Sequence, residues 1–143
     1  MREHLEQAAP DAGITFRFGD IPMRPNTLNA HRLMRWATGQ GFGNAAAEAL
    51  FKSFFDDLED VGNAEILTRI AGDIGLDAAL VSDLLGKDED KNKVQEEILF
   101  FRNLGVSGVP CFIYQGQFAV QGAQPPEAHA KAIEDAAKVT ATE

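Results

Sequence analysis

The sequence predicts a mostly helical α/β protein, with helices first and a small β-hairpin near the C-terminus. From about residue 25 to residue 104, apolar residues recur at intervals of three and four, which is typical of amphipathic helices. Over residues 111–121 the pattern changes to two short runs of β-branched and aromatic residues around Gln115-Gly116, which favours a hairpin. Pro125 and Pro126 then suit the first turn of a last helix. We therefore expect five helices, a hairpin and a closing helix.

The composition is that of a globular domain with an acidic surface. The 143 residues are 45% hydrophobic and 24% charged, which suits one domain with a real core. Lysine and arginine number 13 against 22 acidic residues, which gives a net charge of -9. Such a surface repels phosphate groups, so we expect no nucleic acid and no anionic membrane as a partner.

The first 24 residues read as a helix remnant followed by an extended arm. Residues 1–9 could end a helix that Pro10, Asp11 and Gly13 would stop. Residues 14–22 alternate briefly and then break, which indicates extended backbone.

The first complete helix is expected between Thr27 and Gly39. Asn26 or Thr27 is a plausible N-cap, and Gly39 and Gly41 would end the element. Its apolar stripe is expected at Leu28, His31, Leu33 or Met34, and Trp36.

Three further helices follow from the same periodicity. Residues 44–62 read as one amphipathic helix whose last acidic residues, 56–60, are solvated. Asn63 would cap a helix that Gly75 stops, and Asp77 would cap the next one over residues 78–86. The expected buried residues are Leu50, Phe51, Phe54, Phe55, Leu58, Ile66, Leu67, Ile70, Ala71 and Ile74.

The fifth helix is expected from about Asp88 to Leu104, closed by a left-handed Gly105. The segment 88–93 begins like a calcium-binding loop, but Lys93 stands where glycine is needed and Leu99 where glutamate is needed. We expect no metal site there or elsewhere. The expected core residues of this helix are Val94, Ile98, Leu99 and Phe101.

The sequence contains no targeting signal that we can identify. The N-terminus has no apolar stretch typical of a secretory signal, and no run of about 18 apolar residues predicts a membrane span. A single cysteine, Cys111, cannot form a disulfide within the chain. We therefore expect a cytoplasmic protein.

A two-stranded hairpin is marginal by itself, because its outer edges leave backbone groups unpaired. We expect either a partner chain or a further segment to complete the sheet. A homodimer is the simplest form of the first alternative.

Two segments carry a resemblance to a known family. "GVSGVPCFIYQGQFAVQGAQPPE", residues 105–127, resembles the C-terminal part of DsbA-family thioredoxin-fold proteins, especially the FrnE-like branch near 2-hydroxychromene-2-carboxylate isomerases and kappa-class glutathione transferases. "PNTLNAHRLMRWA", residues 25–37, looks like the first helix of that family's inserted helical domain. The resemblance implies a thioredoxin-like α/β fold with three parts: residues 1–24 as a remnant and arm, 25–104 as the helical domain, and 105–143 as a ββα unit.

The resemblance also implies thiol-disulfide exchange through a mixed disulfide. Relatives begin with a strand and then a Cys-x-x-Cys, or a serine in the isomerases, at a helix N-terminus, and no Cys-x-x-Cys occurs in these 143 residues. We therefore expect a truncated thioredoxin-like fold that is inactive by itself. The alternatives are a non-catalytic module that dimerises through its hairpin edge, or a glutathione-dependent isomerase fragment. The implied partner is a thiol-containing peptide or a small thiol such as glutathione, and no other cofactor is expected.

The resemblance places the site at the Val109-Pro110 step, where the family has a cis-proline loop that binds extended substrate through its backbone. It also suggests Asn29, His31, Ala123 and Gln124 as residues lining the groove.

Cys111 is a candidate redox thiol, but its neighbours are apolar and offer no cation that would stabilise a thiolate. A buried, inert strand residue is the simpler interpretation. Histidines at 4, 31 and 129 are scattered, and a structural role is the simpler interpretation of His31 as well. Five phenylalanines could line a pocket, although residues of this kind more often form core: Phe51, Phe54, Phe55, Phe100 and Phe101.

Overall fold

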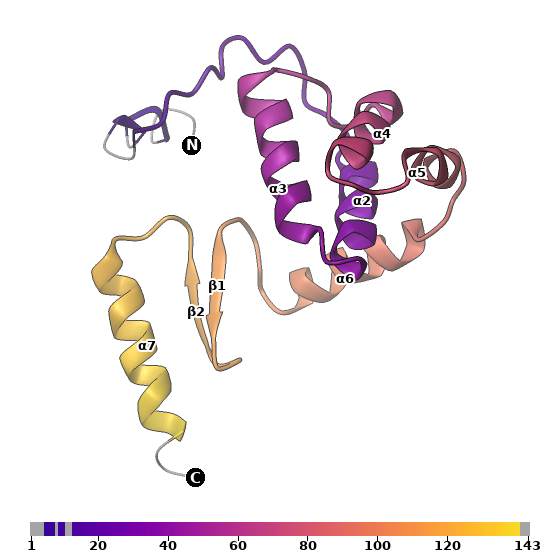
Figure 1. Cartoon of the computed structure of the whole chain (residues 1–143). Helices are drawn as coiled ribbons and strands as arrows, with labels where there is room; N and C mark the ends of the chain where they lie inside the picture. Colours follow the sequence, from indigo (N-terminus) through magenta and orange to yellow (C-terminus); the bar gives the residue numbers. More distant parts are fainter. Residues whose placement is uncertain (1–4, 8, 11–12, 141–143) are drawn as a thin grey trace. The chain divides into compact units, whose positions relative to one another are not determined.

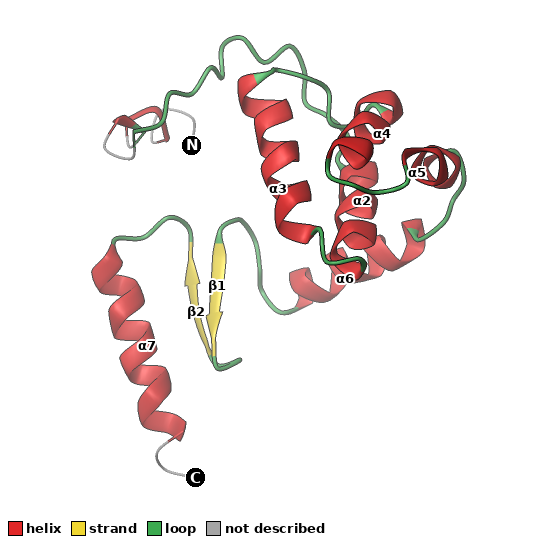
Figure 2. Ribbon diagram, in the orientation of Figure 1, coloured by secondary structure: helices red, strands yellow, loops and turns green. Residues whose placement is uncertain are grey.

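The computed structural model describes residues 5–7, 9–10 and 13–140 of the chain (Figures 1 and 2). The chain forms two compact units, Met1–Gln95 and Glu96–Glu143, and each is considered by itself. Residues 5–7 are helical, whereas Asp11, expected to help stop this helix, lies outside the described residues. The larger elements are α2 (Leu28–Gly39), α3 (Gly43–Phe51), the π-helical η2 (Lys52–Asp56), α4 (Ala64–Asp73), α5 (Ala78–Leu85), α6 (Lys91–Asn103), β1 (Cys111–Tyr114), β2 (Phe118–Gln121) and α7 (Pro126–Thr140).

This order confirms the predicted class, which is helices followed by an antiparallel hairpin and a final helix (Figure 2). None of the described helices is both long and apolar enough to cross a bilayer.

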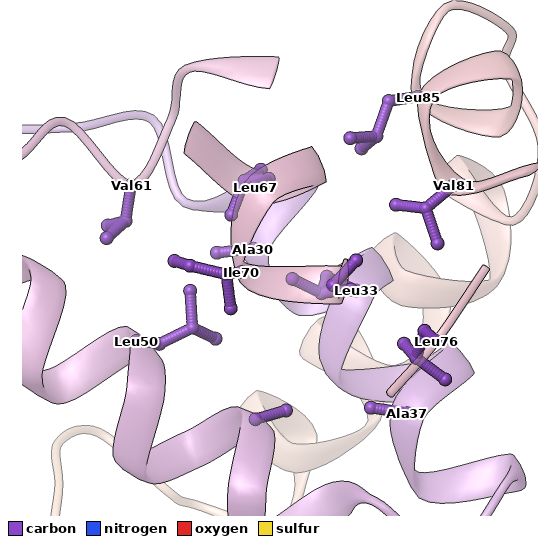
Figure 3. Packing of buried hydrophobic residues seen from close by; sticks show 12 residues of the cluster. Ala30, Leu33, Ala37, Leu50, Val61, Leu67, Ile70, Leu76, Val81 and Leu85 are labelled. Carbon is purple, nitrogen blue, oxygen red and sulfur yellow. The ribbon is translucent and has the colours of Figure 1, made fainter. Parts of the chain in front are cut away.

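The core of the helical unit lies where α2 packs against α3 and α4, and where α4 packs against α5. Figure 3 shows Leu33 and Ile70 pointing into this core with Leu50, Leu67 and Val81 around them. Close packing of side chains from four helices explains why this unit holds most of the buried apolar residues. The cluster comprises Ala30, Leu33, Ala37, Ala46, Leu50, Val61, Leu67, Ile70, Ala71, Leu76, Val81 and Leu85.

The predicted caps at the starts of α4 and α5 are confirmed. The Asn63 side chain accepts hydrogen bonds from the backbone N–H groups of Glu65 and Ile66, at 2.8 and 3.4 Å. The Asp77 carboxylate accepts one from Leu80 N–H at 3.0 Å. At α2 the cap residue is Thr27, but the side chain that accepts a bond, from Leu28 N–H at 3.1 Å, belongs to Asn26.

Left-handed glycines end three helices with the same pair of backbone bonds. Gly105, with φ of 85°, donates to Arg102 O at 2.9 Å, and Val106 N–H donates to Phe101 O at 3.1 Å. Gly41 and Gly75 end α2 and α4 in the same way. This arrangement satisfies carbonyls that the helix itself leaves open, and it needs a residue tolerant of positive φ. The prediction for Gly105 is thus confirmed.

The single helix expected over residues 44–62 is wrong in its second half. The α-helix ends at Phe51 and continues as the π-helical turn η2, after which Leu58 adopts a left-handed φ of 58°. Asp57 N–H donates to Lys52 O, five residues back, at 3.0 Å. Phe51, expected to be buried, is 64% exposed.

The helix expected to begin at Asp88 begins at Lys91, because Asp90 adopts a left-handed φ of 57°. Of the four core residues predicted for α6, only Val94 is buried. Leu99 and Phe101 are exposed, so the amphipathic pattern did not identify a buried face in the second half of this helix.

A buried arginine connects α2 to the end of α5 and to the segment between α5 and α6. Arg32 has no exposed surface, and its guanidinium donates to four backbone carbonyls at 2.6, 3.4, 2.9 and 2.7 Å. These carbonyls belong to Leu84, Leu85, Lys87 and Glu89. Burial lowers the pKa of Arg32, while the nearby carboxylates of residues 88–90 act in the opposite direction. The planar fork of arginine suits such a set of acceptors better than a lysine would.

The second unit is a ββα arrangement. Cys111 pairs with Gln121 and Tyr114 with Phe118 across the antiparallel hairpin, and α7 packs against both strands. The Tyr114 hydroxyl and His129 Nδ1 are 2.7 Å apart, and the rings of Phe112 and His129 meet edge to face. These contacts fix α7 to the hairpin.

Candidate functional site

The loop before β1 carries the first candidate residues. The Val109–Pro110 peptide bond is cis, and the carbonyl of Pro110 accepts a hydrogen bond from Gly122 N–H at 2.8 Å. This bond extends the hairpin pairing by one step beyond Cys111 and Gln121. The loop therefore leads directly into the ladder of the hairpin.

Val109 lies in the open in this loop, with 90% of its surface exposed. Within the described residues, neither its N–H nor its carbonyl makes a hydrogen bond. A free N–H and carbonyl at the end of a strand can pair with another extended segment.

Gln121 holds the other end of the loop, a role that the sequence analysis did not assign. Its side-chain Nε2 donates to Gly105 O at 3.2 Å, and its Oε1 accepts from the Ser107 hydroxyl at 3.1 Å. The Gln124 side chain in turn donates to Gln121 O at 3.1 Å. A polar residue at the last position of β2 was the only sequence signal for this contact.

Cys111 is half-buried and has a free thiol. No charged residue occurs between residues 103 and 126, so the neighbouring sequence supplies no cation that would stabilise a thiolate. A half-buried position differs from the full burial expected for an inert core residue. Its redox role remains a prediction.

The residues suggested as groove lining fall into two groups. Ala123 and Gln124 lie in the exposed turn before α7 in the second unit. Asn29 and His31 lie on α2 in the helical unit. The Asn29 side chain accepts a hydrogen bond from Arg32 at 2.9 Å, so it supports the buried arginine.

His31 lines a cavity of about 670 Å³ in the helical unit. Arg24 and Thr27 are the other polar lining residues, and apolar residues of α2, α3 and η2 form the rest together with Pro25 and Val61. Three of the five phenylalanines considered as pocket liners belong to it, namely Phe51, Phe54 and Phe55. The other two, Phe100 and Phe101, are exposed residues of α6 in the second unit.

In the part of the chain that the structure describes, no group of three or more potential ligand side chains could hold a metal ion. The segment that begins like a calcium loop has a structural use. Asp90 accepts a hydrogen bond from Trp36 Nε1 at 2.9 Å, and Lys93 Nζ lies 2.8 Å from its other carboxylate oxygen. The hydrogen bonds from Lys93 and Trp36 lower the pKa of Asp90.

The chain is similar to known proteins in sequence and in fold. The chain is 26% identical over 136 residues to the protein YwbO of Bacillus subtilis (strain 168), a match that covers 94% of this chain and 67% of YwbO. It superposes on the crystal structure of a probable DsbA oxidoreductase from Streptomyces coelicolor with a TM-score of 0.82 and 29% sequence identity. That match covers 94% of this chain and 58% of the Streptomyces protein, so the chain spans little more than half of that relative.

The family comparison agrees with both matches. Residues 1–134 match the model of the DSBA-like thioredoxin domain, which is most of the chain. The helical unit and the ββα unit described above are the parts of the fold that these residues form. The chain therefore belongs to the DSBA-like thioredoxin domain family.

Proposed function

We propose that this chain serves thiol-disulfide exchange and that Val109 and Pro110 bind the extended substrate. The observation that carries the proposal is the free backbone of Val109, which stands 90% exposed at the entry to β1. Family membership and the likeness to a probable DsbA oxidoreductase support the class of reaction.

The exchange itself needs a dithiol. A thiolate attacks one sulfur of the substrate disulfide, a mixed disulfide forms and the other substrate sulfur leaves as a thiolate. A second thiolate then attacks the mixed disulfide, which releases reduced substrate and leaves the dithiol oxidised. These 143 residues hold one cysteine, so they cannot supply both thiols. The contribution of this chain is therefore to hold the substrate strand beside the reacting sulfurs.

Strand addition explains how one site accepts many sequences. Main-chain hydrogen bonds give affinity with little demand on the side chains of the bound segment. The three hydrogen bonds of the Gln121 and Gln124 side chains hold the loop in place before substrate binds. The loop therefore loses less conformational entropy on binding.

Two variants of Val109 test this proposal. Val109→Pro removes the backbone N–H, whereas Val109→Ala removes only side-chain atoms. The probe is a labelled, unstructured peptide that is rich in β-branched residues and whose cysteine is S-methylated. We expect this peptide to bind wild type and V109A with equal affinity. We expect it to bind V109P at least about tenfold more weakly. Fluorescence anisotropy in the presence of reductant measures these affinities. Equal binding of V109P and V109A would contradict the proposal.

A second candidate function is assembly through the hairpin. The described sheet has only two strands, and Phe112 and Ile113 of β1 are exposed. An unpaired, apolar strand edge favours pairing with a second copy of the chain. Light scattering with and without reductant separates the options. A dimer that survives reductant but is lost in Ile113→Lys supports strand pairing, and a monomer in both conditions rules it out.

A further inference from the structure

The cavity of the helical unit has the features of a small-molecule site. Its volume of about 670 Å³ lies in the range of about 300–1,000 Å³ that is typical of ligand pockets. It is formed wholly by residues of one compact unit, between Arg24 and Val61. The inference uses only residues of this unit and does not rest on the proposed function.

The wall of the cavity is apolar and aromatic. Phe54 and Phe55 lie on it as consecutive residues, and their rings meet edge to face with centroids 4.8 Å apart. They belong to the π-helical turn η2, a type of turn that is rare and often occurs at functional sites. Phe51 also lines the cavity but is 64% exposed, so a ligand in the cavity would cover an aromatic ring that now faces water.

No acidic residue is among the described residues that line the cavity, although the chain as a whole has 22 acidic residues. The lining includes Arg24, Thr27 and His31, three residue types whose side chains can all donate a hydrogen bond.

Arg24 also has no counter-ion within the described residues, which sets it apart from most basic side chains of the helical unit. Arg17 pairs with Asp20, Lys52 with Asp57, and Arg69 with Glu59 and Asp73. In an acidic protein, an arginine that lines an apolar cavity and makes no ion pair among the described residues is complementary to an anionic ligand.

From these observations we infer that the cavity binds an amphipathic organic anion, with an aromatic body among the phenylalanines and an acidic group near Arg24 and His31. The apolar wall supplies affinity through burial of the ligand body, and the two basic side chains select its charge. Such a ligand would bind without any change in its covalent structure.

Two naphthalene dyes serve as probes, because both are fluorescent when buried and they differ in charge. 1-Anilinonaphthalene-8-sulfonate is an anion, and N-phenyl-1-naphthylamine is neutral. We expect Arg24→Glu to weaken binding of the anionic dye at least about tenfold and to change binding of the neutral dye less than about twofold. Arg17→Glu is the matched control, since it makes the same change of charge on an arginine outside the cavity. It should leave both affinities within about twofold of wild type.

Ala47→Phe places a larger side chain in the cavity and should weaken the binding of both dyes. Circular dichroism checks that the variant keeps its helix content. In wild type, the amide signals of Thr27, His31 and Ala47 should shift when the anionic dye is added, which locates the site without any substitution. If R24E and R17E lost affinity for the anionic dye equally, the inference would be overturned, because binding would then depend on net charge alone. Shifts confined to residues outside the cavity would also overturn it.

Discussion

Replacing Arg32 with methionine should destabilise the helical unit more than any exposed arginine could. The guanidinium has no exposed surface and donates to carbonyls of Leu84, Lys87 and Glu89, and it lies 5.0 Å from the centre of the Trp36 ring. Methionine keeps much of the apolar stem but leaves these carbonyls without their donor. Removing one partner of a buried, charged set of hydrogen bonds costs about 3–5 kcal/mol.

The assay follows from the position of the single tryptophan. Trp36 lies on α2 in the helical unit, so urea unfolding followed by its fluorescence reports on this unit. With an m-value of about 2 kcal/mol/M, the expected loss moves the midpoint down by about 2 M urea.

Arg69→Met is the matched control, because Arg69 is half exposed and makes surface ion pairs with Glu59 and Asp73. Pairs of this kind contribute about 0–1 kcal/mol. If the midpoint of R32M moved no further than that of R69M, the role assigned to Arg32 would be refuted.

Three further predictions concern stability at low pH, the N-caps of two helices and disulfide reductase activity. Hydrogen bonds from Lys93 and Trp36 lower the pKa of Asp90, so their stabilisation is present above about pH 4 and is lost as the pH falls through the folded-state pKa. The Asp90→Asn variant should therefore lose less free energy of unfolding than wild type as the pH falls through this range. An equal loss in both proteins would argue against this role of Asp90. Asn63→Ala and Asp77→Ala should each lower stability by about 1 kcal/mol in urea unfolding. Asn44→Ala is the neutral control, because the Asn44 side chain makes no hydrogen bond among the described residues. In an insulin-reduction assay the 143-residue chain should show no turnover above buffer because it holds one cysteine, and clear turnover would contradict this.

Local signals in the sequence predicted local structure well. Asn63 and Asp77 cap their helices because a cap needs only a short polar side chain and the next turn of backbone. Gly105 and the Gln115-Gly116 turn have positive φ for equally local reasons. The order of elements and the family resemblance were predicted correctly from such signals.

Features that depend on distant contacts were missed. Burial of Arg32 needs carbonyls more than 50 residues away, and an arginine in sequence is normally read as exposed. The same contacts accompany the later start of α6, since the Glu89 carbonyl binds Arg32 and the Asp90 carboxylate binds Trp36. The π-helical turn that places Phe54 and Phe55 together had no recognisable signal in an otherwise regular apolar pattern.

The candidate site stays a prediction. Val109 and Pro110 were suggested through the resemblance, whereas the support from Gln121 depends on the pairing of two strands. Asn29 was suggested as a groove residue, but its side chain is bound to Arg32. His31 lines a cavity, and its association with Arg24 required the structure.

The proposal that Val109 binds an extended strand is tested most directly by mapping a bound peptide on wild-type chain. With the S-methylated peptide described above, we predict that the amide signals of Val109 and Cys111 shift most, with smaller changes along β1. Shifts that leave Val109 and Cys111 unchanged while other surfaces respond would contradict the proposal.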